Sequence, residues 1–395
     1  MIPRRLHNSA VAARESYPAI LVTGPRQSGK TTFVKAAFSD LPYVNLESPL
    51  ERADFESDPL GFLGRFPDGA IFDEVQYTPK LLSYLQVRVD EEGKMGRWVL
   101  TGSQQIELVR GATQSMAGRV SILELLPFAR EELPGNGRPR TLDEAVLRGG
   151  YPPLHHESRS LEPSDWLENY LATFVQRDVA AVLKPRNPVA FDHFLRVCAT
   201  RTGQELNKAR LAEECEVDQK TIGHWLGTLE QCYVIRLLRP HHANFRKRLV
   251  KRPKLYFLDS GLACRLLHIA DVQQLATHPL RGALFETWCY TEVLKHFANR
   301  GRRESLWYWR SSDGIEIDLI VERGRELTPI EIKAGRSPSP QAAAGIGKLR
   351  ELSARDDRVT IGHGLVLYGG NETRTGSRHD FISWNAIDAA LEKLG

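Results

Sequence analysis

The segment from Gly24 to Thr32 constrains the fold of this chain more than any other feature of the sequence. It reads Gly-Pro-Arg-Gln-Ser-Gly-Lys-Thr-Thr, a complete G-x-x-x-x-G-K-[ST] motif, and it stands between an apolar stretch at 19–22 and a helical stretch at 33–38. Strand, loop and helix in this order form a P-loop, whose backbone N–H groups face the phosphates of a nucleotide. The sequence therefore predicts an α/β fold built around a phosphate-binding loop.

The residues of this loop are predicted to bind the nucleotide, and two of them have distinct chemical roles. Lys30 would contact the β- and γ-phosphates, and the hydroxyl of Thr31 can coordinate Mg²⁺. The expected cofactors are therefore ATP and Mg²⁺. The predicted cofactor-binding residues are Gly24, Pro25, Arg26, Gln27, Ser28, Gly29, Lys30, Thr31 and Thr32.

Two carboxylates follow the apolar stretch at 69–72, and a P-loop protein needs an acidic residue on a neighbouring strand. Asp73 would hold the Mg²⁺ ion, and Glu74 would polarise the attacking water. The alternative is that the two acids form a solvated strand end. The first interpretation predicts that the nucleotide is hydrolysed as well as bound.

Composition places the chain among ordinary folded proteins. Of 395 residues, 26% are charged and 42% are hydrophobic, and 53 basic against 49 acidic residues leave a net charge of +4. This length predicts two or three domains. No apolar stretch reaches the ~20 residues of a membrane span and none at the start resembles a signal peptide, so a cytoplasmic location is expected. The five cysteines, never spaced C-x-x-C, are expected to be buried thiols.

Short segments along nearly the whole chain are typical of one family. They are the P-loop and the segments at 72–76 (Phe-Asp-Glu-Val-Gln), 100–104 (Leu-Thr-Gly-Ser-Gln), 116–120 (Met-Ala-Gly-Arg-Val), 126–128, 149–153, 177–178, 254–262 and 331–333. Through them the chain resembles the bacterial and archaeal AAA+ ATPases that carry a C-terminal DUF4143 region. In AAA+ proteins a small polar residue at a strand end senses the γ-phosphate. The resemblance therefore makes Ser103 the candidate sensor and Gln104 the second choice.

The same resemblance implies that an arginine of a neighbouring subunit completes the ATPase site, and hence that the protein self-associates in ATP. Arg119, in the Ala-Gly-Arg segment, is the first candidate for this arginine finger and Arg110 is the second. The alternative role for Arg119 is a salt bridge to Glu124 or Glu131.

A helix-turn-helix is predicted at 206–229, after a linker at 134–139 and helices at 142–148 and 165–183. Asp218 is placed to cap the second helix of the motif. The residues that this helix would turn inward are Ile222, Leu226 and Leu229.

The stretch from 232 to 258 contains eight Lys or Arg residues and no acidic one, and it lies where a winged helix would have its wing. One interpretation is a DNA-binding surface in which this wing and the second helix contact phosphates. The other is a winged helix that packs against protein. The predicted nucleic-acid contacts are Lys220, His224, Arg246, Lys247, Arg248, Lys251 and Arg252.

The elements predicted after residue 280 have the order of the PD-(D/E)xK nuclease fold. They are a helix at 281–297, strands at 306–309, 315–321 and 327–333, a helix at 341–353 and a strand at 364–368. This resemblance implies that Glu286, Asp318 and Glu331 bind Mg²⁺ or Mn²⁺. Lys333 shares a strand face with Glu331 and would assist phosphodiester hydrolysis. The alternative is a set of ion pairs in a module that has lost catalysis.

The sequence thus predicts three domains. These are a P-loop AAA+ ATPase domain at 1–135, a helical and winged-helix domain at 140–278 and a PD-(D/E)xK-like α/β domain at 279–395. The predicted function is a Mg²⁺-dependent ATP hydrolase that acts on DNA, with metal-dependent nuclease activity in the third domain. The alternative is a nucleotide-switched binding or regulatory protein whose third domain is noncatalytic.

Overall fold

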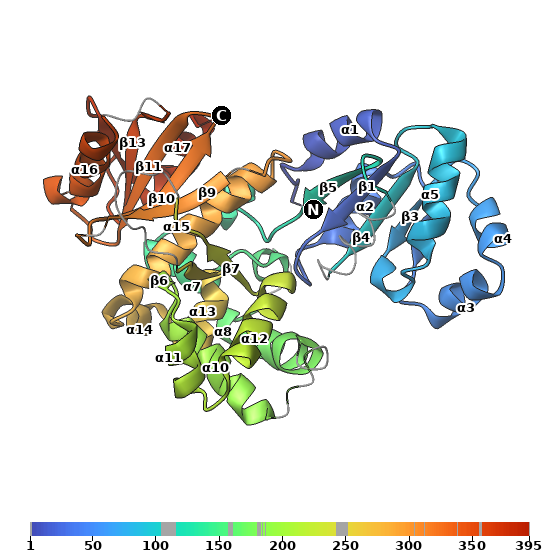
Figure 1. Ribbon diagram of the computed structural model, residues 1–395, viewed down its shortest axis with the longest axis horizontal. Coiled ribbons are helices and arrows are strands. Elements are labelled where there is room, and N and C mark those ends of the chain that lie inside the picture. Colours follow the sequence, from blue (N-terminus) through green and yellow to red (C-terminus); the bar gives the residue numbers. More distant parts are fainter. Residues whose placement is uncertain are drawn as a thin grey trace.

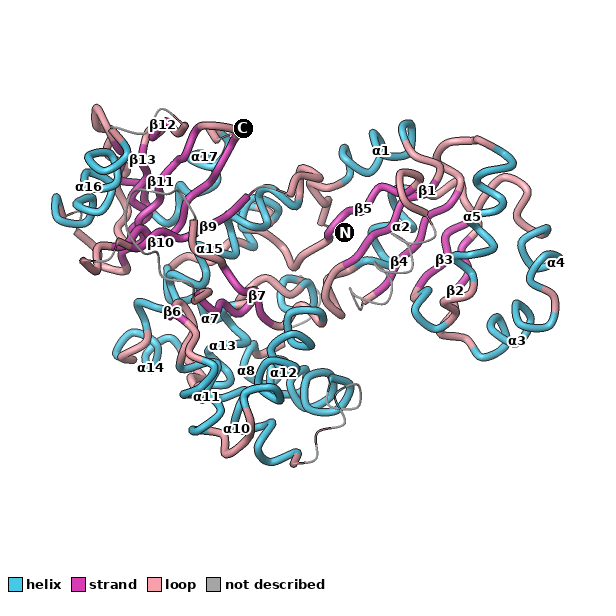
Figure 2. Tube along the Cα trace, in the orientation of Figure 1, coloured by secondary structure: helices cyan, strands magenta, loops and turns pink. Residues whose placement is uncertain are grey.

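The computed structural model describes residues 2–103, 116–156, 161–179, 183, 185, 187–241, 252–303, 305–311, 313–337, 339–354 and 358–394. Three sheets organise this part of the chain: five strands in the order β2-β3-β4-β1-β5, three in the order β6-β8-β7, and six with β14-β13-β11-β10-β9 as their main path. Figure 1 shows the first sheet on the right, the largest sheet at the upper left, and helices of the middle segment between and below them. Figure 2 shows the same separation of the two larger sheets.

The N-terminal sheet is parallel wherever its strands pair. Its strands are β1 (Ala19–Thr23), β2 (Tyr43–Asn45), β3 (Ala70–Asp73), β4 (Trp98–Gly102) and β5 (Val120–Glu124). Its helices are α1 (His7–Ser16), α2 (Lys30–Ala37), α3 (Pro49–Ser57), α4 (Pro59–Gly64) and α5 (Leu81–Glu92). Because β4 lies between β3 and β1, the chain segments that follow these three strands meet at one edge of the sheet.

The middle segment is mainly helical and contains the predicted helix-turn-helix. Its helices are α7 (Leu142–Arg148), α8 (Pro163–Tyr170), a π-helical stretch (Leu171–Val179), α10 (Pro188–Thr200), α11 (Lys208–Glu214), α12 (Gln219–Gln231), α13 (Ser260–Leu266) and α14 (Val272–Thr277). Asp218 caps α12 as predicted, because its carboxylate accepts a hydrogen bond from Thr221 N at 2.7 Å. The residues Ile222, Leu226 and Leu229 are buried, as the spacing indicates.

An antiparallel hairpin occupies the position of the predicted wing. Its strands are β7 (Ile235–Leu238) and β8 (Lys254–Phe257), and the short β6 (Gln204–Glu205) pairs with β8. The backbone N–H of His241 donates to Tyr308 O at 2.7 Å, and Tyr308 N–H donates to Arg239 O at 3.1 Å. The chain that leaves β7 therefore lies along a strand of the C-terminal sheet.

The C-terminal segment follows the predicted order of elements. These are α15 (Arg281–Ala298), β9 (Ser305–Arg310), β10 (Glu316–Arg323), β11 (Glu326–Lys333), α16 (Ala344–Ser353) and β13 (Gly364–Tyr368). Three further elements complete it, namely β12 (Thr360–Ile361), β14 (His379–Ser383) and α17 (Ile387–Glu392). Strands β9, β10 and β11 are antiparallel neighbours, whereas β11, β13 and β14 run parallel.

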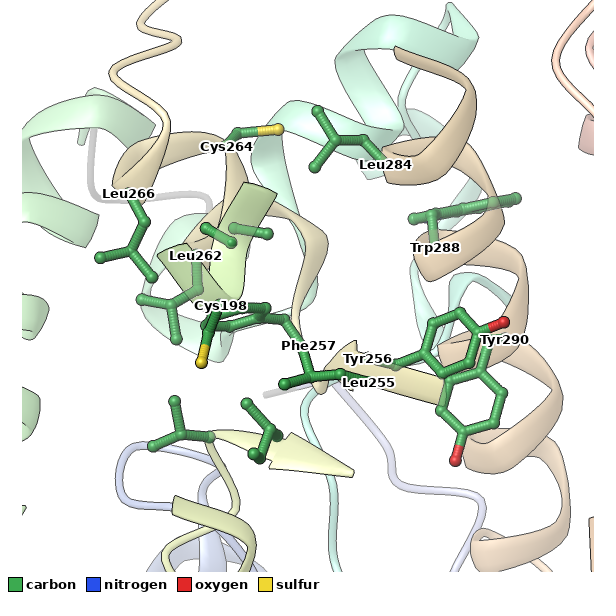
Figure 3. Close-up of a cluster of buried hydrophobic side chains, with 14 of the residues drawn as sticks. Cys198, Leu255, Tyr256, Phe257, Leu262, Cys264, Leu266, Leu284, Trp288 and Tyr290 are labelled. Carbon is green, nitrogen blue, oxygen red and sulfur yellow. The ribbon is translucent and has the colours of Figure 1, made fainter. Parts of the chain in front are cut away.

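The largest cluster of buried hydrophobic residues among those described joins the middle and C-terminal segments, extending from Leu142 to Leu391. Figure 3 shows part of it, in which Tyr256 lies against Tyr290 and Cys198 and Cys264 lie among apolar side chains. All five cysteines are free and buried, as expected from their spacing. The N-terminal sheet has separate core clusters. Within the described residues, no helix combines the length and the apolar character needed to cross a membrane.

Candidate functional site

The P-loop connects β1 to α2 in a backbone path that requires glycine. At Gly24 the φ angle is +148°, and a Cβ atom there would lie 2.1 Å from the carbonyl oxygen of Leu125. Gly29 precedes α2 with a φ angle of +90°. These two glycines let the loop curl between strand and helix, as the motif predicts.

Lys30 is buried within the curve of this loop. Its Nζ donates to the carbonyl oxygens of Gly24 at 3.0 Å and Pro25 at 2.9 Å. Burial lowers the pKa of Lys30 to about 8, against the opposing attraction of Glu74 and Asp73. Because burial disfavours the charged ammonium, a phosphate anion bound in the loop would stabilise it.

Asp73 is the meeting point of hydroxyl groups from three neighbouring elements. Thr31 Oγ1 on α2 and the hydroxyl of Tyr43 on β2 donate to its Oδ2 at 2.7 and 2.6 Å. Thr101 on β4 donates to the other carboxylate oxygen. The Thr31 hydroxyl and the Asp73 carboxylate thus lie in contact, and both are the hard oxygen ligands that Mg²⁺ prefers. The two residues fit the predicted magnesium site.

Glu74 follows β3 with a φ angle of +58°, in the left-handed region. Its carboxylate accepts a hydrogen bond from Ser103 Oγ at 3.2 Å and another from the side-chain amide of Gln76. Gln76 also donates to Ser103 Oγ at 3.3 Å. The predicted sensor therefore lies beside the predicted water-polarising residue. Sequence reasoning did not assign Gln76 to this site, although it stands two positions after Glu74 in a segment typical of the family.

Arg119 lies far from the nucleotide loop of its own chain. It directly precedes Val120, which pairs with Ala19 at the amino-terminal edge of the sheet, whereas the P-loop follows β1 at the carboxyl-terminal edge. Its described ion-pair partner is Asp90, whose Oδ2 accepts from Nη2 at 3.0 Å. Any action of Arg119 on phosphate would therefore have to be on a neighbouring subunit.

The salt-bridge partners predicted for Arg119 were wrong. Glu124 accepts a hydrogen bond from Arg236 at 2.6 Å, and Glu131 pairs with Arg300 at 3.1 Å. Both acids face the middle and C-terminal segments, because β5 continues directly toward them. The second choices for sensor and finger, Gln104 and Arg110, lie outside the described residues.

The basic wing is only partly a solvent-facing surface. Arg236 pairs with Glu124 of the ATPase sheet, and Lys254 is only 2% exposed, among carboxylates. Treating the whole basic run from 232 to 258 as one contact surface was therefore wrong for these two residues, because acidic partners distant in sequence neutralise them.

The remaining predicted nucleic-acid residues divide into two groups. Lys220 and His224 are exposed on α12, and Arg252 is exposed two residues before β8. The other four predicted contacts lie outside the described residues, namely Arg246, Lys247, Arg248 and Lys251. A role for any of these residues in contacting nucleic acid stays a prediction.

The C-terminal candidates meet at β10 and β11, as the resemblance implies. Lys333 Nζ lies 2.9 Å from Glu331 Oε2 and 3.1 Å from Asp318 Oδ2. The backbone N–H of Ile332 donates to the same Asp318 oxygen at 2.8 Å. Burial, followed by the charge of Asp318, raises the pKa of Glu331 to about 8.

Glu286 joins this group through a lysine that sequence reasoning did not assign to it. Lys254 Nζ lies 3.0 Å from Glu286 Oε1 and 3.8 Å from Asp318 Oδ1, and it also pairs with Glu316. The hydroxyl of Tyr256 donates to the same Glu286 oxygen. Burial raises the pKa of Glu286 to about 7, although Lys254 opposes the shift.

We define the carboxylate centre as the four acids and two lysines that meet at this place. They are Glu286, Glu316, Asp318, Glu331, Lys254 and Lys333. Within the described residues, no group of three or more His, Cys, Asp or Glu side chains is placed to hold a metal ion. Metal binding by Glu286, Asp318 and Glu331 therefore stays a prediction.

A pocket of about 350 Å³ opens beside Lys333, at the carboxyl-terminal ends of β11 and β13. This is the edge of an α/β sheet at which ligands commonly bind. The side chains around it are partly aromatic and partly polar. The lining residues are Lys333, Gly335, Ser337, Ser339, Gln341, Ala342, Val366, Tyr368 and Phe381.

Three family models match successive parts of the sequence. An AAA domain matches residues 16–133, a domain of unknown function (DUF8612) matches residues 139–273, and a second one (DUF4143) matches residues 281–387. Among solved structures, the Walker-type ATPase PABY2304 of Pyrococcus abyssi is 16% identical, with a TM-score of 0.42 over 68% of this chain and 96% of that one. A RuvB variant of Thermotoga maritima is also 16% identical, with a TM-score of 0.29 over 60% and 87%.

The sequence relationship extends through most of the chain. The uncharacterized protein Rv2008c of Mycobacterium tuberculosis is 34% identical over 325 residues, which cover 82% of this chain and 71% of that relative. A Mycobacterium bovis protein, Mb2031c, matches to the same extent. With the P-loop, the acidic strand end and the C-terminal sheet all present, the chain belongs to the family of AAA-type ATPases that carry a C-terminal DUF4143 domain.

Proposed function

We propose that this protein is a Mg²⁺-dependent ATP hydrolase. The observation that carries the proposal is the hydrogen bond from Thr31 Oγ1 to Asp73 Oδ2 at 2.7 Å, which joins the P-loop to the acidic strand. Lys30 lies in the same loop, and Glu74 follows Asp73 directly. The arrangement brings together a phosphate-binding loop, a cation site and a carboxylate that can orient water.

Each residue has a separable role in this reaction. Lys30 leaves its two backbone carbonyl partners to bind the β- and γ-phosphates. Thr31 and Asp73 are the residues that would hold Mg²⁺, and the ion would supply positive charge to offset the negative charge that develops on the phosphates. Glu74 accepts a hydrogen bond from the attacking water, while Ser103 holds the Glu74 carboxylate in place. Arg119 of a neighbouring subunit is the candidate finger.

ATP binding and turnover by purified variants test this proposal. Lys30→Ala should abolish binding or turnover, whereas Glu74→Gln should still bind ATP but hydrolyse it at least about a hundredfold more slowly, a typical loss for a missing general base. Lys80→Ala, at an exposed lysine of the same domain, is the matched control. Turnover equal to the control in both variants would refute the assignment.

We further propose that the protein acts on DNA and that the carboxylate centre cleaves phosphodiesters. The exposed Lys220 and His224 support the first part, because they lie on the second helix of a helix-turn-helix. The second part is supported by Lys333, whose Nζ lies within 3.1 Å of two carboxylates at the rim of a pocket. That lysine can bind a phosphate oxygen while the carboxylates hold a divalent ion.

A divalent ion at this centre would supply an activated water and neutralise charge on the phosphate. Asp318 and Glu331 are the residues that would hold it, since their carboxylates already share one cation, the ammonium of Lys333. Lys333 would then stabilise the negative charge that develops on the phosphate. Glu286 would complete the set from α15.

Nucleic-acid cleavage in Mg²⁺ or Mn²⁺, with and without ATP, tests this second proposal. Asp318→Asn and Lys333→Met should each abolish cleavage and leave ATP turnover unchanged, because the two centres are built from different segments. Lys348→Met, at a lysine that pairs with Glu351 on α16, is the control. Absence of cleavage by the unaltered protein under all conditions would favour the noncatalytic alternative, a nucleotide-switched binding protein.

One observation favours that alternative specifically. Lys254 contributes a second ammonium to the carboxylate centre and pairs with three of its acids. Two lysines among four carboxylates pair with each of the acids without any metal. Whether Lys254 can be displaced by a metal ion therefore determines whether the carboxylate centre is a metal site or only a set of ion pairs.

A further inference from the structure

Lys254 reaches the carboxylate centre from outside the C-terminal sheet. It is the first residue of β8, and it pairs with Leu238 of β7 in the hairpin of the middle segment. The three acids that form ion pairs with it belong instead to α15 or β10, whereas Glu205, its neighbour on β6, pairs with Arg310. The centre is therefore completed by a segment that lies before the C-terminal domain in the sequence.

The surroundings of Lys254 are those of a bound cation. Its side chain is 3% exposed, its Nζ lies 3.0 Å from Glu286 and 3.8 Å from Asp318, and it pairs with Glu316 as well. Carboxylate oxygens that converge on one positive charge are also the donor set that Mg²⁺ and Mn²⁺ prefer. An ammonium and a divalent ion at the same oxygens would repel each other strongly.

We propose that the ammonium of Lys254 occupies a second cation position of the carboxylate centre, beside that of Lys333, so that Lys254 and a divalent metal ion that draws on Glu286 and Asp318 exclude each other there. This inference rests on the metal binding proposed above for the same carboxylates. When a metal binds, Lys254 must release Glu286 and Asp318 and become accessible. While Lys254 stays in place, its ammonium offsets part of the negative charge of these carboxylates without metal.

The position of Lys254 is tied to the ATPase domain by its own hairpin. Arg236 on β7 pairs with Glu124 on β5 at 2.6 Å, and Tyr256 on β8 lies opposite Arg236. The hydroxyl of Tyr233, two residues before this hairpin, donates to Thr23 Oγ1 at 2.9 Å. Thr23 is the last residue before the P-loop. The hairpin that carries Lys254 is therefore in direct contact with the nucleotide domain.

Mn²⁺ titration of the nucleotide-free protein, followed by the electron paramagnetic resonance of free Mn²⁺, tests the exclusion. Binding that is lost in Asp318→Asn defines the carboxylate centre. Lys254→Met keeps an unbranched side chain only one atom shorter and removes the charge, so it should bind Mn²⁺ at least about tenfold more tightly than the unaltered protein. Lys348→Met is the matched control and should leave the affinity unchanged. Equal or weaker Mn²⁺ binding by Lys254→Met would overturn the proposal.

A second measurement avoids the variant altogether, in case Lys254→Met does not fold. Acetylation of lysines with a water-soluble anhydride, read by mass spectrometry, should modify Lys254 several-fold faster when Mn²⁺ is present, with Lys348 as the internal reference. Constant protection of Lys254 while Mn²⁺ binds at the Asp318-dependent site would also overturn the proposal.

The two proposals fail in distinguishable ways. Tight binding by Lys254→Met, with neither binding nor cleavage by the unaltered protein, would uphold the exclusion and refute the nuclease function. Failure of both proteins to bind Mn²⁺ would refute the two together.

Discussion

The hydroxyl of Tyr233 donates a hydrogen bond to Thr23 Oγ1 at 2.9 Å, across 210 positions of sequence. Tyr233 has a φ angle of +59°, an uncommon conformation for a bulky residue, and its side chain is 1% exposed. Nearby, the hydroxyl of Tyr170 donates to the carbonyl oxygen of Arg26 within the P-loop at 3.3 Å. Two tyrosines of the middle segment thus contact the nucleotide loop or the strand that leads into it.

Loss of the Tyr233 hydroxyl should weaken this junction. Tyr233→Phe should reduce the free energy of unfolding by about 1 kcal/mol, because the buried hydrogen bond to Thr23 is lost while packing is retained. Urea denaturation measures the change. Tyr84→Phe, at a tyrosine that is 36% exposed on α5, should have no comparable effect. Equal stability of the two variants would contradict the prediction.

Gln76 should act as a positioning residue for ATP hydrolysis. Its amide donates to both Glu74 and Ser103, so Gln76→Leu should let the Glu74 carboxylate rotate away from the attacking water. We expect kcat to fall about tenfold while KM for ATP changes little, because no phosphate contact is removed. Steady-state ATPase assays check this, with Gln86→Leu on α5 as control. A raised KM with unchanged kcat would instead indicate a role in binding.

The raised pKa of Glu331 predicts how stability depends on pH. Its pKa rises from 4.5 to about 8 on folding, chiefly through burial, so the folded state binds more protons than the unfolded state between these pH values. The free energy of unfolding should therefore fall as pH rises from about 5 to 8, by up to about 1.4 kcal/mol per pH unit for one such group. Glu331→Gln should flatten this dependence. An identical pH profile, measured by urea denaturation, would contradict it.

Glu351→Gln is the control for that experiment, because Glu351 is exposed on α16. Its profile should follow that of the unaltered protein. Glu286, whose pKa is raised to about 7, should contribute a smaller total fall of the same sign, over a narrower pH range, that remains in Glu331→Gln.

The salt dependence of DNA affinity should distinguish exposed basic residues, which contact phosphates, from buried ones, which do not. If Lys220 contacts one phosphate, Lys220→Ala should reduce the slope of log affinity against log salt by about 0.9 on duplex DNA. Arg236→Met should leave this slope unchanged, because Arg236 pairs with Glu124, and should instead destabilise the protein. Fluorescence anisotropy across a salt series measures both. An unchanged slope in Lys220→Ala would assign α12 to protein packing.

Mixing two inactive variants tests whether Arg119 of one subunit acts at the ATPase site of its neighbour. Arg119→Ala lacks the finger and Lys30→Ala lacks the phosphate contact, so neither should hydrolyse ATP alone. In mixed assemblies an intact P-loop can face an intact finger, and part of the turnover should return. As the control, each single variant is mixed with a protein that carries both substitutions. No recovery in mixtures that demonstrably assemble would exclude Arg119 as the finger.

The sequence by itself predicts the features that depend on residues only a few positions apart. The P-loop, the helix at Leu142–Arg148 and the cap at Asp218 were predicted because glycine positions, apolar periodicity and capping residues act within a few positions of the chain. The pairing of Glu331 with Lys333 also follows from strand alternation alone. The order of the C-terminal strands could also be predicted, because each strand has its own local pattern of residues.

Only the tertiary structure decided where the charges of the middle segment belong. The sequence presents Arg236 and Lys254 as members of one basic run, yet folding places the first against Glu124 and the second against Glu286. Nothing local distinguishes a solvated lysine from a buried one, because the acids that neutralise it are remote in sequence and meet it only when the sheets pack. Whether a charged side chain is buried depends on how the sheets pack. The tertiary structure therefore determines it, and the local sequence does not.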